Sequence, residues 1–234
     1  MKNKLLLLLA LTGLSLPALS QTADSAEFKN ELGIIASPSL QYLFQNKSLP
    51  VGLIYKRQVK PDQAWRYIVK GWYRNQKTPV ITYSDGSSYY ALKQTDYQIQ
   101  ALVGYEWQKE LSARWQFYYG ADAGAGYTKY NTKIEITDNV PASYYFSSFC
   151  YSNSHTLFFT LKPMAGIRFN LSRNLYLATE TNIAINYGLT KQKHFQTAFY
   201  DTPDPQTTET PSYTSSSALV NFAPLANIQL VYKF

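Results

Sequence analysis

ALVNFAPLANIQLVYKF, residues 218–234, alternates apolar side chains with small or polar ones. Because successive side chains of a strand point to opposite faces, this period of two predicts a β-strand. One face is continuously apolar, and the other is mixed and carries Asn227, Gln229 and Lys233. The apolar face consists of Phe222, Pro224, Ala226, Ile228, Leu230 and Tyr232, and the sequence then ends on Phe234.

Seven earlier segments repeat this pattern. The clearest is AWRYIVKGWYR, residues 64–74, in which Trp65, Tyr67 and Val69 alternate with Arg66 and other inward positions. A helix would scatter these aromatic and basic side chains around its circumference, so the period of two favours a strand. The eight predicted strands cover residues 31–44, 50–58, 64–74, 96–107, 114–128, 155–171, 175–189 and 218–234.

The connections between these strands alternate in length. A soluble β-sandwich has no reason to hold all its long loops at one end, whereas membrane barrels have short periplasmic turns and longer extracellular loops. The sequence therefore predicts an all-β fold, an eight-stranded antiparallel up-and-down transmembrane β-barrel with short periplasmic turns and long extracellular loops. Short links at 45–49, 60–63, 108–113 and 171–174 alternate with long segments at 75–94, 129–154 and 190–217.

The start of the chain has the composition of an export signal. Lys2 and Lys4 precede an apolar run over residues 5–16, and small residues follow at Ala18 and Ser20. This order predicts a secretory signal peptide that is cleaved from the mature protein. The predicted organisation is a signal peptide over 1–20, a short periplasmic segment over 21–30 and the barrel over 31–234.

The complete pattern resembles a known family. An alternating apolar strand that ends on an aromatic residue resembles the closing strand of bacterial outer-membrane β-barrels. The chain from Glu31 to Phe234 is similar to the small outer-membrane β-barrel family of Gram-negative bacteria, the architecture of OmpA transmembrane domains and OmpX-like proteins. The resemblance implies an outer-membrane location, contact with outer-membrane lipid, and dependence on periplasmic chaperones and the insertion machinery. It also implies that Leu230, Tyr232 and Phe234 form the insertion signal.

The inward positions of the predicted strands carry many charges. Side chains fill the interior of an eight-stranded barrel, so an open pore is not expected. Buried charges persist when they are paired and hydrogen-bonded, which favours a structural ionic network. An anion-preferring ion or proton path is the functional alternative. The predicted network consists of Glu31, Lys56, Arg66, Lys70, Arg74, Asp96, Glu106, Arg114, Asp122, Lys162, Arg168 and Glu180.

Outward aromatic residues near the strand ends predict two girdles at the membrane interfaces. Pro38, Pro163 and Pro224 also fall on the lipid-facing side, where each removes a ladder hydrogen bond. We expect bulges at these prolines, or positions near the membrane boundary. The predicted girdle residues are Trp65, Tyr73, Tyr97, Trp107, Trp115, Tyr127, Tyr187 and Tyr232.

Three functions are compatible with such a barrel. The first is a structural or surface-interaction protein, in which tyrosines of the long loops contact an extracellular glycan or protein. The second is a narrow channel or transport accessory. The third is a lipid-modifying enzyme, for which the candidate groups are His155 with Ser152 and Ser154, and His194 with Asp201.

No catalytic motif supports the third alternative. The sequence has no P-loop, dinucleotide fingerprint or metal-spaced set of histidines and cysteines, so it predicts no enzyme, cofactor or metal site. The single cysteine, Cys150, falls in a predicted loop with no base evident beside it, and it excludes an intramolecular disulfide. The formal net charge of +7 includes Lys2 and Lys4. Since the remaining basic residues form no cluster, a nucleic-acid partner is not expected.

Overall fold

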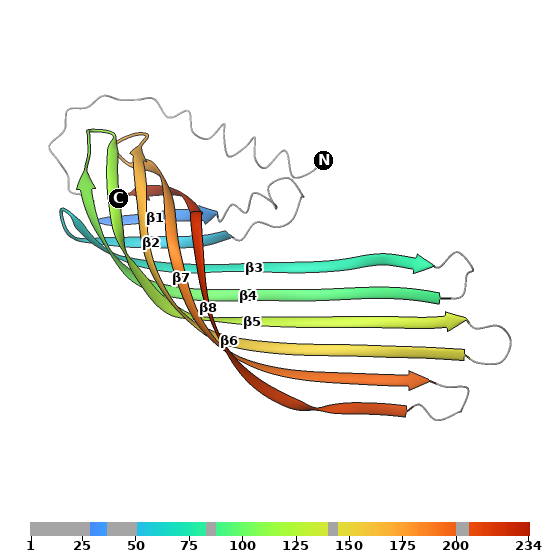
Figure 1. Cartoon of the computed structure of the whole chain (residues 1–234). Helices are drawn as coiled ribbons and strands as arrows, with labels where there is room; N and C mark the ends of the chain where they lie inside the picture. The colour runs from blue at the N-terminus through green and yellow to red at the C-terminus, as the bar shows by residue number, and fades with distance from the viewer. Residues whose placement is uncertain (1–28, 37–50, 83–87, 140–144, 200–205) are drawn as a thin grey trace.

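The computed structural model describes residues 29–36, 51–82, 88–139, 145–199 and 206–234, and nearly all of them lie in eight β-strands. The strands are antiparallel and follow one another around a closed barrel in sequence order (Figure 1), which confirms the predicted eight-stranded up-and-down fold. None of these residues forms a helix long and apolar enough to span a membrane. The strands are β1 (Asn30–Ala36), β2 (Val51–Lys60), β3 (Gln63–Thr82), β4 (Ser88–Glu110), β5 (Trp115–Asn139), β6 (Tyr145–Asn170), β7 (Leu175–Phe199) and β8 (Gln206–Lys233).

The barrel closes where β1 meets β8. Glu31 of β1 lies opposite Lys56 of β2 on one side and opposite Lys233 of β8 on the other. Two backbone hydrogen bonds join Asn30 and Phe234, with N to O distances of 3.2 and 2.9 Å. The two ends of the described barrel are therefore neighbours, although they lie about 200 residues apart in sequence.

Some of the predictions concern parts of the chain that lie outside the described residues. They are the signal peptide over 1–20, most of the segment 21–30, the part of the first strand over 37–44, and the link 45–49.

The short turns at one end of the barrel lie where the sequence predicts them. Ser112 and Ser172 occupy equivalent places in the turns after β4 and β6. The Ser112 hydroxyl accepts a hydrogen bond from the backbone N–H of Trp115 (3.2 Å), and the Ser172 hydroxyl accepts one from Leu175 (3.1 Å). A serine side chain that satisfies a backbone donor two or three residues onward is a typical turn device. The third turn joins β2 to β3 through Pro61 and Asp62.

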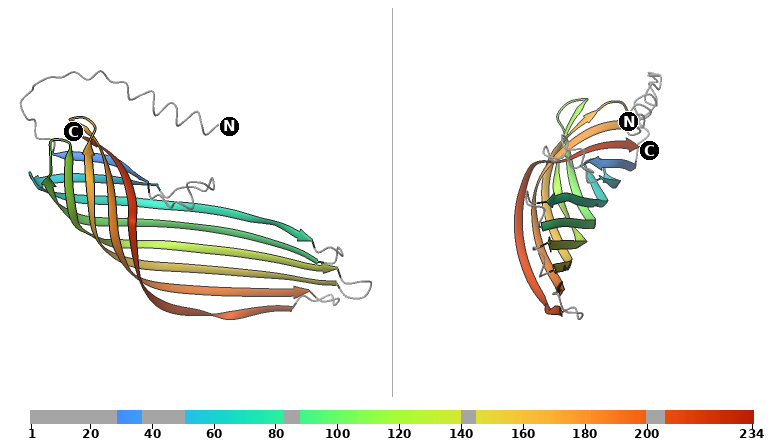
Figure 2. Two further views of the ribbon diagram at one scale, coloured as in Figure 1. Left: turned by 45° about the horizontal axis from the view of Figure 1, so that its top comes forward. Right: turned by 90° about the vertical axis from the view of Figure 1, so that its right-hand side faces the viewer.

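The long loops predicted over 75–94, 129–154 and 190–217 are largely strand, which corrects the sequence analysis. The hairpins continue past the closed barrel as a curved sheet formed by β3 to β8 (Figures 1 and 2). In the described residues, pairing of β2 with β3 ends at Val51 opposite Gly71, while β3 remains paired with β4 to Thr82. Threonine, tyrosine and isoleucine are frequent in these polar segments and suit strands whose two faces both contact water.

Within the barrel, the alternation sorts side chains as predicted. On β3, Ala64, Arg66 and Ile68 are buried, whereas the neighbouring Trp65 and Val69 are exposed on the outer face. Five aliphatic residues contribute to the buried interior, because a small barrel must fill its lumen with side chains. They are Ile35, Ile54, Ile68, Leu102 and Val231.

The strand prolines have different surroundings. At Pro224 the register between β7 and β8 shifts by two residues, because Glu180 lies opposite Asn227 whereas Asn182 lies opposite Ala223. This irregularity agrees with the expected bulge, and it turns Leu225, which strict alternation places on the inner face, toward the exterior. Pro163 is exposed on β6, where no register shift accompanies it. Pro38 lies outside the described residues.

Candidate functional site: a charged barrel interior

Glu106, on β4, is the centre of one half of the charged interior. Its carboxylate accepts a hydrogen bond from the Lys56 ammonium at 2.8 Å and forms ion pairs with Arg168 at 3.1 Å and with Arg66 at 3.3 Å. The Gln108 amide donates a further hydrogen bond at 2.7 Å. Glu106 and Gln108 are two positions apart on β4, so both side chains point into the interior.

Arg66, on β3, connects this half to a second group of carboxylates. Its guanidinium lies 2.8 Å from Glu180 and 3.0 Å from Asp122. Lys162 contacts both carboxylates, at 2.9 Å from Asp122 and 3.4 Å from Glu180. Glu180 also accepts a hydrogen bond from the amide of Asn227 at 2.9 Å. The planar guanidinium suits this role because its several N–H donors can face different acceptors.

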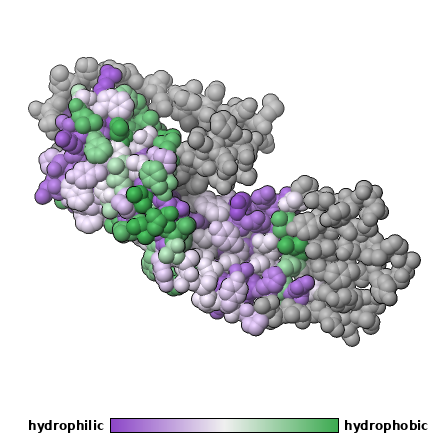
Figure 3. Space-filling model, viewed as in Figure 1, coloured by the Kyte–Doolittle hydropathy of each residue, from purple (hydrophilic) through white to green (hydrophobic). Residues whose placement is uncertain are grey.

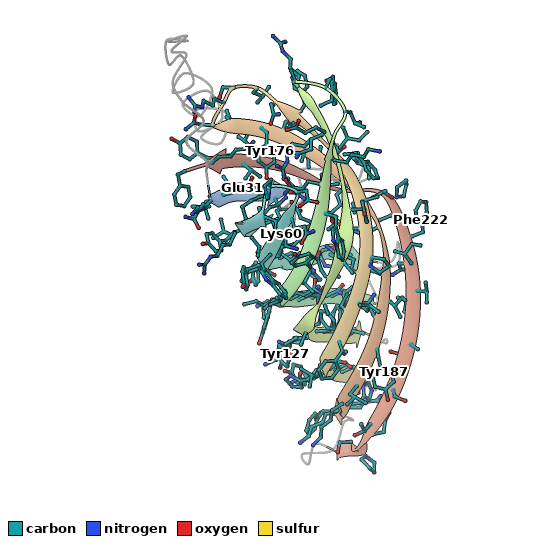
Figure 4. All side chains as sticks on the ribbon, turned by 90° about the vertical axis from the view of Figure 1, so that its left-hand side faces the viewer. Glu31, Lys60, Tyr127, Tyr176, Tyr187 and Phe222 are labelled. Carbon is teal, nitrogen blue, oxygen red and sulfur yellow. The ribbon has the colours of Figure 1, made fainter. Side chains whose placement is uncertain are left out.

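The turn end of the interior is filled by Arg168 and two aromatic rings. The Arg168 guanidinium carbon lies 4.0 Å from the centre of the Tyr176 ring and 5.9 Å from that of Tyr118. The Tyr176 hydroxyl donates to Glu31 at 2.6 Å, and Arg168 forms an ion pair with the same carboxylate at 3.5 Å. Glu31 and Tyr176 are both labelled in Figure 4, where they lie next to each other inside the barrel.

Together these groups form what we name the charged core. Its four basic and four acidic side chains are each 4% exposed or less, and their formal charges cancel. A neutral, internally paired set avoids the desolvation cost of unpaired buried ions. The charged core comprises Lys56, Arg66, Lys162 and Arg168 with Glu31, Glu106, Asp122 and Glu180.

The other predicted network residues lie elsewhere. Arg74 pairs with the buried Asp96 further along the hairpin and is separate from the charged core. Lys70 lines a cavity beside the core, and no carboxylate of the described residues lies within ion-pair distance of it. The assignment of Arg114 to the interior is corrected: this residue lies in the turn before β5 and is exposed, because β5 begins one residue later.

Sequence reasoning assigned no role to several neutral residues that complete the core. Tyr118 and Tyr176 are fully buried, and they contact Lys56 and Arg168 through their rings. The Gln229 amide donates to Glu180 at 3.0 Å. The alternation of side chains predicts that these residues point inward. Which ring contacts which cation depends on how neighbouring strands are staggered, and alternation does not give that stagger.

Gly166 gives the Tyr118 ring its space. A Cβ atom at Gly166 would lie 2.4 Å from Tyr118 Cζ and 2.4 Å from the Thr179 carbonyl oxygen, well inside normal contact distance. At Gly188, by contrast, an added Cβ would meet only side chains, Thr156 at 3.3 Å and Ser217 at 3.4 Å. The absence of a side chain at Gly166 is therefore required by the close approach of two strands and a ring.

We expect Gly166→Ala to lower the free energy of unfolding by about 1–3 kcal/mol, the usual range for an overpacked interior. Gly188→Ala is the matched control and should change it by less than about 0.5 kcal/mol. Urea titrations of the folded protein in detergent, followed by tryptophan fluorescence, compare the two variants. Equal effects would contradict a tight contact between Gly166 and Tyr118.

The outer surface of the barrel has a band without charges. Between the ends of each span, the outward positions of β3 to β8 carry no Asp, Glu, Lys or Arg. Apolar residues gather over the barrel end of the face shown in Figure 3. Exposed Leu, Ile, Val and Phe side chains in such number are unusual for a surface that contacts water.

Aromatic rows border this band. Near the turns, Trp65 packs edge-on against Tyr105 at 5.1 Å between ring centres, and Trp107 stacks with Tyr119 at 5.7 Å. A second row begins with Tyr73, eight positions after Trp65 on β3. This step corresponds to about 26 Å along the strand and about 20 Å of height at a tilt of about 40°. The remaining outward members of the second row include Tyr97, Tyr127 and Tyr187, the last two of which are labelled in Figure 4.

The residues considered for catalysis do not form a nucleophile and base inside the barrel. His155 contacts the Tyr127 hydroxyl and ring on the outer side. Cys150 lies on β6 rather than in a loop, and its Sγ is 3.3 Å from His194 Nε2, so a base does lie beside it. Burial raises the pKa of the Cys150 thiol, however, which opposes formation of a nucleophilic thiolate.

The arrangement of His194 with Asp201 is not tested, because Asp201 lies outside the described residues. Among the residues whose positions are known, no three His, Cys, Asp or Glu side chains come together in a way that could hold a metal ion.

No family model and no curated protein sequence matches this chain. Among solved structures, CarO of Acinetobacter baumannii is similar at 12% sequence identity and a TM-score of 0.38, over 91% of this chain and 100% of the other. A major outer membrane protein of Thermus thermophilus is similar at 10% identity and a TM-score of 0.34, over 88% and 99% of the two chains. LpxR of Salmonella typhimurium follows at 8% identity and 0.25, over 88% and 100%. The fold assignment rests on the strand pairing.

Proposed function

We propose that this chain is an outer-membrane β-barrel that displays its long hairpins as a contact surface outside the cell. The observation that carries the proposal is the charge-free outer band between two aromatic rows. Its height of about 20 Å is close to the apolar band of about 25 Å on outer-membrane barrels, which aromatic girdles also border. Lipid is the solvent that such a surface fits, since water would leave a large apolar area exposed.

The orientation follows from the lengths of the connections. Barrels of this kind have their short turns in the periplasm and their longer connections outside. The turns at Pro61–Asp62, 111–114 and 171–174 would therefore face the periplasm, and the sheet formed by the far parts of β3 to β8 would stand outside the cell.

The charged core supports a barrel that is closed to solutes. Two cavities of about 250 Å³ each lie on either side of it, one beside the turns and one toward the extended hairpins. Between them, Arg66 and Glu106 are fully buried and engaged with several partners. Passage would require several of these ion pairs to separate together, at a cost of several kcal/mol for each uncompensated buried ion.

The extended sheet supports the contact role. Exposed tyrosines lie on three of its strands, Tyr130 on β5, Tyr151 on β6 and Tyr213 on β8. Tyrosine offers a rigid apolar ring and a polar hydroxyl, a combination that is enriched where proteins bind glycans or other proteins. The proposed partner is accordingly an extracellular glycan or protein.

The end of β8 would also serve assembly. We propose that Leu230, Tyr232 and Phe234 are the signal that the insertion machinery and periplasmic chaperones recognise. All three side chains are exposed on the outer face, and the rings of Tyr232 and Phe234 stack at 6.5 Å.

Surface labelling of cysteine variants tests location and orientation together. In a Cys150→Ser background, Tyr213→Cys should react with a membrane-impermeant maleimide on intact Gram-negative cells, because its side chain is 54% exposed on the extended sheet. Ser112→Cys, exposed in a turn, should react only after the outer membrane is permeabilised. Both variants should react equally once denatured in SDS.

Equal labelling of the two positions on intact cells would overturn the proposed orientation, and equal protection would overturn the surface location.

Deleting Phe234 in the Tyr213→Cys variant addresses the insertion signal separately. We expect surface labelling to fall while the amount of synthesised protein stays the same. Unchanged labelling would contradict the proposed insertion signal, whereas the proposed barrel and its orientation would stand.

A further inference from the structure

Lys70 stands apart from the balanced charges of the barrel interior. The four basic and four acidic groups of the charged core compensate one another without it. The two carboxylates that act electrostatically on Lys70, Asp122 and Glu180, are already engaged by Arg66 and Lys162. Lys70 thus adds one positive charge, at membrane depth, that forms no ion pair with a carboxylate of the described residues. This arrangement favours an anionic partner from outside the chain.

The lysine faces a cavity of about 250 Å³ on the side of the charged core toward the extended hairpins. This volume lies just below the range for drug-sized ligands, roughly 300–1,000 Å³, and so suits a smaller molecule. No Asp or Glu is among the residues that line it, whereas the cavity beside the turns is lined by Glu31 and Glu110 as well as by basic groups. The two cavities therefore differ in chemistry although their volumes are the same.

The neutral side chains around Lys70 supply hydrogen-bond donors. Gln100 donates to the Thr160 hydroxyl at 2.9 Å, and this hydroxyl donates to the Asn186 carbonyl oxygen at 2.7 Å. The chain of hydrogen bonds leaves the NH₂ group of Asn186 to donate elsewhere. Asn182, on the same face of β7, lines the cavity too, and within the described residues its amide has no side-chain partner. Lys162 also lines the cavity, but its ammonium is engaged by Asp122 and Glu180. The Lys70 ammonium and the two amides thus line one cavity to which no described carboxylate contributes.

From these contacts we infer that the cavity is a binding site for a small oxyanion, a phosphate or carboxylate group, held by Lys70 with Asn182 and Asn186 as donors. An ammonium group binds phosphate or carboxylate as a point charge, and amide N–H groups complete the shell of the remaining oxygens. The site goes beyond the proposed contact function, since it lies within the barrel and not on the extended sheet.

Thermal unfolding in the presence of anions tests the site. The full chain is folded in dodecyl maltoside micelles, and the unfolding midpoint is followed by the shift in gel mobility on heating. Inorganic phosphate and acetate are each titrated at constant ionic strength, with sodium chloride making up the difference. A ligand that binds only the folded state raises the midpoint with its concentration.

We expect phosphate or acetate to raise the midpoint of the unchanged protein in a saturable manner. Lys70→Met should abolish this shift, and Lys70→Arg should retain it. Lys77→Met, which removes an exposed lysine further along β3, is the matched control and should behave like the unchanged protein. Asn182→Leu provides a second variant that should weaken the shift if Lys70→Met does not fold.

A parallel series with phosphatidylglycerol in the micelles separates the two sources of the anion. A Lys70-dependent shift that appears only with this lipid assigns the site to a headgroup phosphate, whereas a shift with inorganic phosphate or acetate in its absence assigns it to a free anion. The inference is overturned if none of these anions stabilises the unchanged protein, or if Lys70→Met responds as strongly as Lys77→Met.

Discussion

Replacing Glu106 with glutamine is expected to lower the free energy of unfolding by about 3–5 kcal/mol, the range for breaking a buried ion pair. The substitution keeps the size of the side chain and removes the one carboxylate that Lys56, Arg66 and Arg168 all contact. Lys56 would then lack a carboxylate partner among the described residues, and four buried cations would face three carboxylates. Urea titration in detergent, followed by tryptophan fluorescence, measures the change.

Two further variants separate charge balance from packing. Glu110→Gln makes the same chemical change at an exposed position and should stay within about 0.5 kcal/mol of the unchanged protein. Lys56→Met added to Glu106→Gln removes the cation whose only described carboxylate partner is Glu106. Because this pair of changes restores neutrality, we expect the double variant to be more stable than Glu106→Gln alone. If it is less stable, the core is held by packing rather than by charge balance.

Val103→Arg is expected to lower the free energy of unfolding in phospholipid vesicles by about 2–4 kcal/mol, the cost of arginine at the middle of a barrel's lipid face. Val103 is 47% exposed on β4, between the aromatic rows at Trp107 and Tyr97. Val59→Arg, at a site that is 52% exposed beside the turn after β2, should cost about 0–1 kcal/mol.

The contrast between the two valines depends on depth in the bilayer, because their exposures are similar. Unfolding in vesicles of phosphatidylcholine, followed by tryptophan fluorescence, gives both values. An equal cost at Val103 and Val59 would contradict the assignment of the outer band to lipid.

The closed barrel could be predicted because its signal is local. In residues 64–74 and 96–107, a period of two sorts apolar side chains outward and charged ones inward, and no distant contact is needed to detect it. The extended parts of the hairpins gave no such signal. Their two faces are both polar, so residues 129–154 have the composition of a loop although nearly all of the described ones are strand.

The partners within the interior were less predictable than its composition. The alternation of side chains along each strand places Glu31, Arg66 and Glu180 inward. It does not determine which of these side chains contact one another. That depends on the stagger of strands that are distant in sequence, and on the two-residue shift near Pro224. The prediction for Arg114 is wrong for a related reason, because a strand end cannot be located to one residue from alternation alone.

The charged core gives the barrel a means of rejecting wrong strand pairings. Each strand from β1 to β7 supplies at least one of its ions, and β8 contributes the Asn227 amide that donates to Glu180. A hairpin that slips by two residues keeps all its apolar side chains outside, so the hydrophobic pattern does not oppose the error. The slip would nevertheless move each charge by about 7 Å along its strand and leave it without its partner. The apolar pattern therefore determines which face of a strand points outward, and the ion pairs determine the register.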